Sequence, residues 1–174
     1  MAPALRILAV LAAAASFTAP PAWSAPADPV PCSAGQVVVT AAGPEAAVGH
    51  RAVTLIFALA PGVGPCTLTG YPRVESGTGG PLITAQPTLR GYMGGLPSDL
   101  DVPPTITVSP SQRGESVVEG MSVNSAGDPC PNYTDLSVTP PGGSGPVTVA
   151  AAIDSCQLQV HPVTQVVIEP VPPS

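Results

Sequence analysis

The chain has 174 residues, among them 25 Pro and 18 Gly, and it carries a net charge of −6 from 5 basic and 11 acidic residues. This length suits one domain. All five basic residues are Arg, and so few cations cannot form the clustered positive surface with which proteins bind phosphate backbones. The composition therefore excludes nucleic acid as a partner.

Residues 1–24 have the pattern of a secretory signal peptide. Arg6 gives the start a positive charge, residues 7–17 are apolar or small, and two prolines follow. This apolar stretch is shorter than the roughly 20 residues that a membrane-spanning helix needs. Ala22 and Ser24 place small side chains where a signal peptidase reads them, which predicts cleavage after Ser24. Export would remove Arg6 and leave a net charge of −7.

The mature chain is predicted to be an extracytoplasmic monomer, either secreted or associated with the cell wall. We expect a flexible leader at residues 25–31, one domain at 32–169 and a disordered tail at 170–174. Residues 29–31 lack the Leu and small residues expected before a lipid-modified cysteine. Pro or Gly interrupts every later apolar run, so no transmembrane segment is expected after signal cleavage.

The pattern of apolar residues predicts an all-β domain with minimal helix. Within residues 51–60, Val53, Leu55 and Phe57 fall on one face, and this period of two indicates a strand. The other face is also apolar, which favours a central position in a sheet. Turn residues separate many such short runs, as in an antiparallel β-sandwich of the immunoglobulin-like class. The other predicted strands are 36–40, 105–108, 116–118, 136–139, 147–151, 157–160 and 165–169.

Two segments are less regular. Residues 147–161 contain no Pro or Gly, yet both ends alternate with the period of a strand, so we predict two strands joined near Asp154 and Ser155. Residues 75–104 form the longest stretch without a clear strand pattern. A connection of that length usually carries function or is mobile.

Four cysteines, Cys32, Cys66, Cys130 and Cys156, predict two disulfide bonds, because an exported domain meets an oxidising environment. Three pairings are possible. We favour Cys32 with Cys66 and Cys130 with Cys156, since each pair joins neighbours in sequence. Each loop would contribute about 3.5 kcal/mol in the chain-entropy model. Neither a Cys-x-x-Cys pair nor a His at ligand spacing is present, so we expect no metal site and no cofactor.

Three segments resemble a known family. Residues 66–72 read Cys-Thr-Leu-Thr-Gly-Tyr-Pro, residues 46–51 lead through Gly-His into an apolar strand, and residues 156–162 contain the last cysteine. Together they resemble the exported actinobacterial domain-of-unknown-function family numbered 4232, over residues 32–163. The resemblance implies a β-sandwich and the same disulfide pairing, but no activity. The absence of Lys and the wealth of Ala, Pro and Gly suit an actinobacterial source.

His50 and His161 are the residues that could serve in acid–base chemistry. His50 precedes the strand at 51–60, where a histidine more often orders the strand entry by hydrogen bonding. His161 stands before Pro162, where a rim position is the simpler explanation. Residues 143–145, Gly-Ser-Gly, lack the spacing of a nucleophile elbow. We therefore expect no enzyme, with an extracytoplasmic hydrolase that uses His50 or His161 as the alternative.

Residues 88–96 are the strongest candidate for a contact surface. They include Arg90, Tyr92 and Met93, which are residue types enriched at protein interfaces, and glycines that let a loop adapt to a partner. The competing interpretation is that Tyr92 and Leu96 fold back to cover the sandwich. On the first interpretation, the predicted partner contacts are Arg90, Tyr92 and Met93.

The favoured function is a non-enzymatic exported binding or cell-envelope module whose partner is an exported or cell-envelope protein. A glycan is less favoured, because sugar platforms use aromatic faces and the mature chain has only Phe57, Tyr71, Tyr92 and Tyr133. A passive structural or antigenic protein without a specific ligand is the third interpretation.

Overall fold

The computed structural model describes residues 28–143 and 145–168, which contain twelve β-strands and no helix. The predicted signal peptide at 1–24, the start of the leader and the tail at 170–174 lie outside the described residues. The all-β prediction is confirmed. In chain order the strands are β1 Val37–Ala47, β2 His50–Leu59, β3 Cys66–Thr69, β4 Arg73–Ser76, β5 Ile83–Thr84, β6 Gln86–Pro87, β7 Thr105–Val108, β8 Gln112–Met121, β9 Asn132–Thr139, β10 Val147–Asp154, β11 Leu158–Val160 and β12 Thr164–Val167.

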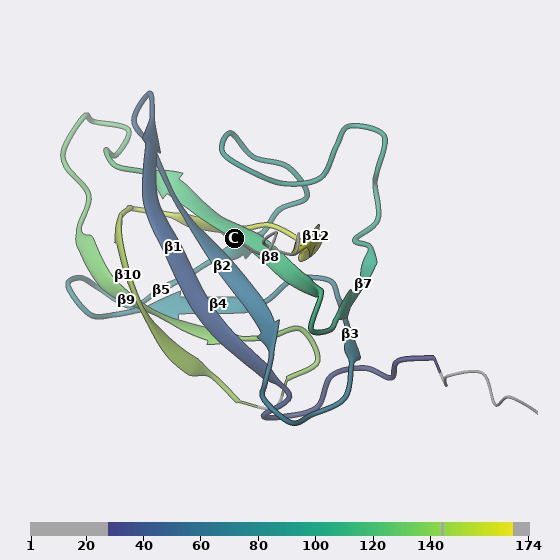
Figure 1. Cartoon of the computed structure of the whole chain (residues 1–174). Helices are drawn as coiled ribbons and strands as arrows, with labels where there is room; N and C mark the ends of the chain where they lie inside the picture. The colour runs from purple at the N-terminus through teal and green to yellow at the C-terminus, as the bar shows by residue number, and fades with distance from the viewer. Residues whose placement is uncertain (1–27, 144, 169–174) are drawn as a thin grey trace, which may run out of the picture.

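The strands form two larger sheets and one strand pair. The first sheet has the order β1-β2-β8-β11-β6, and β12 also pairs with β8. The second has the order β10-β9-β4-β5, while β3 pairs with β7. In Figure 1, β1 and β2 pass in front of β4 and β9, so the larger sheets lie one over the other as in a sandwich. All strand pairs are antiparallel except β11 with β6. Membership of the immunoglobulin-like class stays a prediction.

The hydrophobic core lies between the two larger sheets. Val53, Leu55 and Phe57 on β2 are at most 1% exposed, and Leu136 and Val138 on β9 are fully buried in the same cluster. Each such side chain contributes roughly 1.5–3 kcal/mol through its removal from water. β2 pairs with β1 on one side and β8 on the other, which confirms its predicted central position.

Four short strands were not predicted from the sequence. β3 and β4 have four residues each and were not among the predicted strands, although Leu68 and Val74 are buried in the core. β5 and β6 have two residues each and lie within the segment 75–104. The leader is also paired in part, because the Thr67 N–H donates to Val30 O at 2.9 Å.

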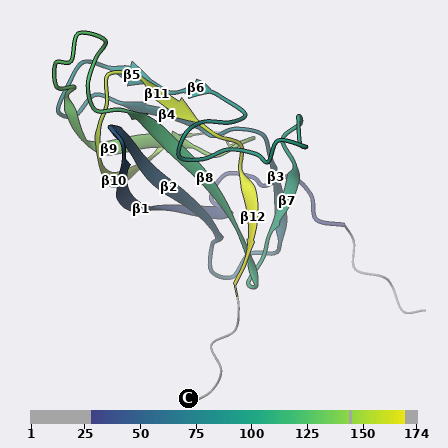
Figure 2. The same cartoon turned by 90° about the horizontal axis from the view of Figure 1, so that it is seen from above.

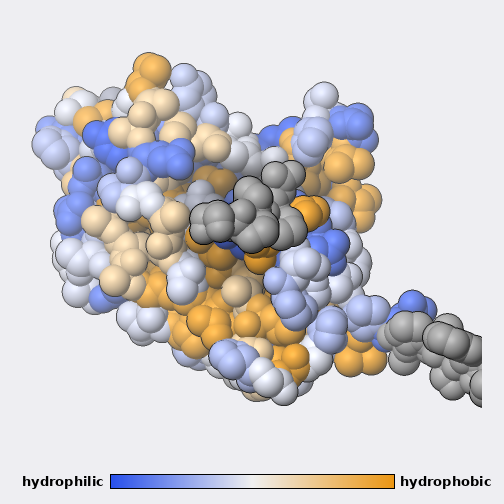
Figure 3. All heavy atoms as spheres, viewed as in Figure 1, coloured by the Kyte–Doolittle hydropathy of each residue, from blue (hydrophilic) through white to orange (hydrophobic). Residues whose placement is uncertain are grey.

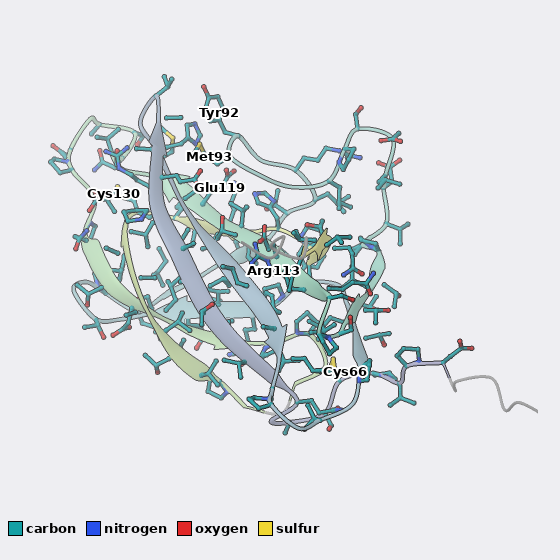
Figure 4. All side chains as sticks on the ribbon, in the orientation of Figure 1. Cys66, Tyr92, Met93, Arg113, Glu119 and Cys130 are labelled. Atoms are coloured by element: carbon teal, nitrogen blue, oxygen red, sulfur yellow. A yellow bond between two sulfur atoms is a disulfide. The ribbon has the colours of Figure 1, made fainter. Side chains whose placement is uncertain are left out.

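The two disulfides join Cys32 to Cys66 and Cys130 to Cys156, so the favoured pairing is confirmed. Among the residues that the structure describes, none of the cysteines is free. Figure 4 places Cys66 and Cys130 at opposite ends of the domain. Segment 147–161 forms β10 and β11 with a break at Ser155, as predicted. The described ranges hold no helix of the length and apolar character needed to cross a bilayer.

Candidate functional site

The segment that follows β6 lies against the outer face of the first sheet. On β8, Val118 points into the core, and Val117, Glu119 and Met121 alternate onto the opposite, outer face. Residues 88–96, which we call the strap, cross β8 on this outer face, and Figure 2 shows this passage from above. The strap separates the outer face of β8 from solvent at Glu119.

Two glycines permit this close approach. A Cβ atom at Gly91 would overlap the carboxylate of Glu119, and one at Gly94 would lie 2.7 Å from the Cβ of Val117. Only a residue without a side chain therefore fits at either position. These glycines were expected to let the loop adapt to a partner. In the structure they let the strap lie directly against the sheet.

Glu119 anchors the strap to β8. The Tyr92 N–H donates to Glu119 Oε1 at 2.9 Å, and the Met93 N–H donates to Glu119 Oε2. The residue is 3% exposed, and a buried carboxylate is tolerated only when hydrogen bonds replace its hydration. Glu119 and the two strap amides thus satisfy one another. Figure 4 shows Met93 above Glu119, with Tyr92 further out.

His161 holds the base of the strap. Its ring is 1% exposed, and Nδ1 lies 2.8 Å from the carbonyl oxygen of Thr88, so Nδ1 carries a hydrogen that it donates. Nε2 has no hydrogen-bond partner and lies 3.5 Å from Glu119 Oε1. The buried imidazole of His161 and the buried carboxylate of Glu119 therefore lie next to each other behind the strap.

The exposed side of the strap meets the tip of the β1–β2 hairpin. The ring of Tyr92 stacks on His50, with centroids 4.1 Å apart and planes 12° from parallel. The hairpin turn is Val48-Gly49, with φ of 46° and 84°. Val48 is 85% exposed, although a β-branched residue rarely adopts this left-handed conformation. The Ser122 N–H and hydroxyl both donate to Gly49 O, which joins the turn to the end of β8.

A pocket of about 420 Å³ lies beside the strap, since its lining includes Glu119 and His50, which both contact Tyr92 of the strap. Its lining residues include Asn124, Gln157, Gln159, Met121 and Cys156. The Asn124 side chain is engaged in its own turn, because its Oδ1 accepts from the Ala126 and Asp128 N–H groups. Four exposed apolar or aromatic side chains at this end form what we call the rim. The rim consists of Val48, Tyr92, Met121 and Val123, which are 85%, 59%, 40% and 39% exposed.

The three predicted contact residues differ in their exposure and in their bonding partners. Tyr92 projects at the rim, and Met93 is half-buried with its backbone on Glu119. The Arg90 guanidinium donates to Pro97 O and pairs with Asp101, so it is engaged within its own loop. Leu96 is 5% exposed and does cover the sheet, as the competing interpretation expected of it. The strap therefore both covers the sheet and presents Tyr92.

His161 faces an acid, Glu119, at 3.5 Å, and His50 stacks on Tyr92. In the described part of the chain, no Ser hydroxyl hydrogen-bonds either ring; Ser116 and Ser155 donate instead to the backbone oxygens of His161 and Gln157. No group of three or more His, Cys, Asp or Glu suited to a metal ion occurs in residues 28–143 and 145–168. Residues 77–80, which are Gly-Thr-Gly-Gly, form the turn between β4 and β5.

Sequence reasoning did not identify Glu119, Val48 or Met121. The signal for Glu119 was present, because it stands as an isolated acid immediately after the predicted strand 116–118, among apolar residues. The turn at Val48 had no such signal, since Asn-Gly or Asp-Gly is the usual sequence of a two-residue hairpin turn.

Comparison with known proteins identifies the family of this chain. The family model described as "Domain of unknown function (DUF4232)" matches residues 32–171, and the chain belongs to this family. Comparison with curated proteins and with solved structures gave no significant match.

Proposed function

We propose that this member of the family is an exported, non-catalytic binding module that contacts an exported or cell-envelope protein through the rim. The observation that carries the proposal is Val48, a large apolar side chain that is 85% exposed on a backbone of φ 46°. Unfavourable conformations of this kind cluster at functional sites. In Figure 3 an apolar projection caps the upper tip of the β1–β2 hairpin.

The chemistry of the rim supports a protein partner. Aromatic residues and Met are enriched at the centres of protein interfaces, where charged residues are depleted. Met121 and Val123 line the pocket, Tyr92 stacks on the lining residue His50, and the lining includes no Lys or Arg. The strap is fixed by buried bonds from Glu119 and His161, so a partner meets a surface that is already ordered.

Export is supported by the N-terminal pattern of residues 1–24 and by two disulfides, which persist in oxidising compartments. The lack of Lys agrees with an actinobacterial source. A partner in the cell wall would retain the protein there, whereas a secreted partner would not.

Direct binding tests the proposal. The oxidised chain, immobilised without residues 1–24, is used to capture proteins from an exported fraction, and each captured protein is then purified and titrated against variants. Val48→Asn and Tyr92→Ala should each weaken binding by about 10-fold, as for hot-spot residues. Leu82→Ser is the matched control, because Leu82 is 77% exposed and does not line the pocket. Equal binding by all variants would place the contact outside the rim and overturn the proposed surface, and the absence of any partner would favour the passive interpretation.

A further inference from the structure

We propose that the Cys130–Cys156 disulfide is a thiol-exchange site, at which the thiolate of an external thiol opens the bond and thereby loosens the surface that carries the rim. The exchange itself does not depend on the proposed function, whereas its effect on binding rests on that function. Three features of the structure support it: the burial of the four cysteines, the pocket that Cys156 lines, and the connections that the bond joins.

The two disulfides differ in burial. Cys32 and Cys66 are 7% and 0% exposed, and both belong to the hydrophobic core. Cys130 is 9% exposed, whereas Cys156 is exposed. Loop length does not separate the two bonds, because sequence separations of 34 and 26 positions stabilise a chain almost equally in the chain-entropy model. Since exposed disulfides are the ones that thiols open readily, Cys130–Cys156 is the exchangeable bond of the two.

The pocket beside the strap gives a thiol room to approach. Its volume is about 420 Å³, and Cys156 is one of its lining residues. Its lining includes the acid Glu119 and no Lys or Arg, so nothing in it would attract a thiol that carries a further negative charge. A small thiol without an acidic group therefore suits this approach.

The exposure of Cys156 sets the direction of the exchange. The incoming thiolate forms a bond to Cys156 Sγ while the bond from this sulfur to Cys130 breaks. The electron pair of the broken bond leaves on Cys130, and the resulting thiolate takes up a proton from solvent. The product is a mixed disulfide at Cys156 and a free thiol at Cys130. A second external thiolate attacking the mixed disulfide would release the thiol of Cys156 as well.

The bond joins two connections that both line the pocket. Residues 122–131 connect β8 to β9, and residues 155–157 connect β10 to β11. Within the first connection, residues 123–129 are all exposed, so packing holds it only weakly. The Cys130 N–H donates to Ser122 O at 2.9 Å, but a single hydrogen bond contributes far less than a covalent cross-link. Opening the disulfide therefore loosens the part of the rim that Val123 provides.

Reduction of the folded chain without residues 1–24 tests the exchange. 2-Mercaptoethanol, a neutral thiol, is added at fixed pH, samples are quenched with acid, and the released thiols are alkylated and located by peptide mass mapping. We expect Cys130–Cys156 to open at least about 10-fold faster than Cys32–Cys66, with the first mercaptoethanol adduct on Cys156. In concentrated urea the two rates should agree within about twofold, because unfolding removes the difference in burial.

The opened chain, with its two released thiols alkylated, tests the effect on the surface. The amide of Asn124 donates to Asp128 O within the first connection, and its hydrogen exchange should become at least about 10-fold faster. The amide of Thr67, which donates to Val30 O beside the other disulfide, is the matched control and should exchange as before. The partner captured from the exported fraction should bind the opened chain about 10-fold more weakly.

The outcomes separate this inference from the proposed function. Equal opening of both bonds in the folded chain, a preference that persists in urea, a first adduct on Cys130, or unchanged exchange at Asn124 would each overturn the inference. If the rim variants lose the partner but the opened chain binds it as tightly as the oxidised chain, the proposed function stands and this inference fails. If the bond opens selectively while the rim variants retain the partner, the proposed function fails and the exchange site stands.

Discussion

At the scale of single residues, Val48 combines an unfavourable backbone with an exposed side chain. A φ of 46° brings the Cβ of an L-residue close to its own backbone, at a cost of roughly 1–2 kcal/mol. Because the side chain is 85% exposed, packing within this chain does not offset that cost. Asn adopts the same conformation readily, since its short polar side chain bonds locally.

We predict that Val48→Asn raises the free energy of unfolding by about 1 kcal/mol, because it relieves the left-handed strain. Urea denaturation of the oxidised chain measures this value. Val102→Asn is the matched control, because Val102 is 75% exposed and its φ is not positive; it should stay within about 0.5 kcal/mol of the original chain. A destabilised Val48→Asn variant would show that Val48 serves the fold and would remove the main support for the rim.

The sequence could not reveal this position for a physical reason. The strand pattern predicted at 36–40 continues in the structure to Ala47, but Gly43-Pro44 interrupts the apolar alternation. The register between β1 and β2 shifts at this same place, between Ala42 and Glu45. The hairpin, and with it the turn at Val48, therefore becomes visible only once the strands are paired.

At the scale of elements, the strap is held by side chains that are distant in sequence. Its amides at Tyr92 and Met93 donate to Glu119, which lies 27 and 26 positions away. His161 reaches Thr88 across 73 positions. Because these partners lie far away in the sequence, the strap itself has no periodic pattern from which the bonds could be predicted. β2 was predictable because apolar alternation records which face is buried. β8 was predicted only at 116–118, because Gly114, Ser116 and Gly120 stand at buried positions of this strand.

We predict that Glu119→Gln loosens the strap. A Gln side chain offers one carbonyl oxygen, so one of the two strap N–H groups would face an NH₂ group and lose its acceptor. Amide hydrogen exchange at Tyr92 and Met93 should become at least about 10-fold faster, and stability should fall by about 1–3 kcal/mol. Glu115→Gln, on the same strand but in a partly exposed pair with Arg113, should leave strap exchange unchanged. Unaltered exchange in Glu119→Gln would mean that contacts other than this carboxylate hold the strap.

At the scale of the whole molecule, the two disulfides fasten opposite ends of the domain. Cys66 begins β3, and its bond to Cys32 ties the N-terminal segment to that strand. Cys130 lies between β8 and β9, and Cys156 lies between β10 and β11. Cys156 also lines the pocket. Both bonds stabilise the fold, but only the second borders the proposed binding surface.

Removing each disulfide should therefore give similar losses of stability and different losses of binding. In the chain-entropy model, Cys32→Ser with Cys66→Ser and Cys130→Ser with Cys156→Ser should each lower the free energy of unfolding by about 3.5 kcal/mol. The second double variant alone should also weaken binding of the captured partner, because it frees the connections that border the rim and the pocket. Urea denaturation and titration of the partner, at a temperature where both variants are folded, measure the two effects. If both double variants bound the partner as the original chain does, the Cys130–Cys156 bond would stabilise the fold without shaping the binding surface.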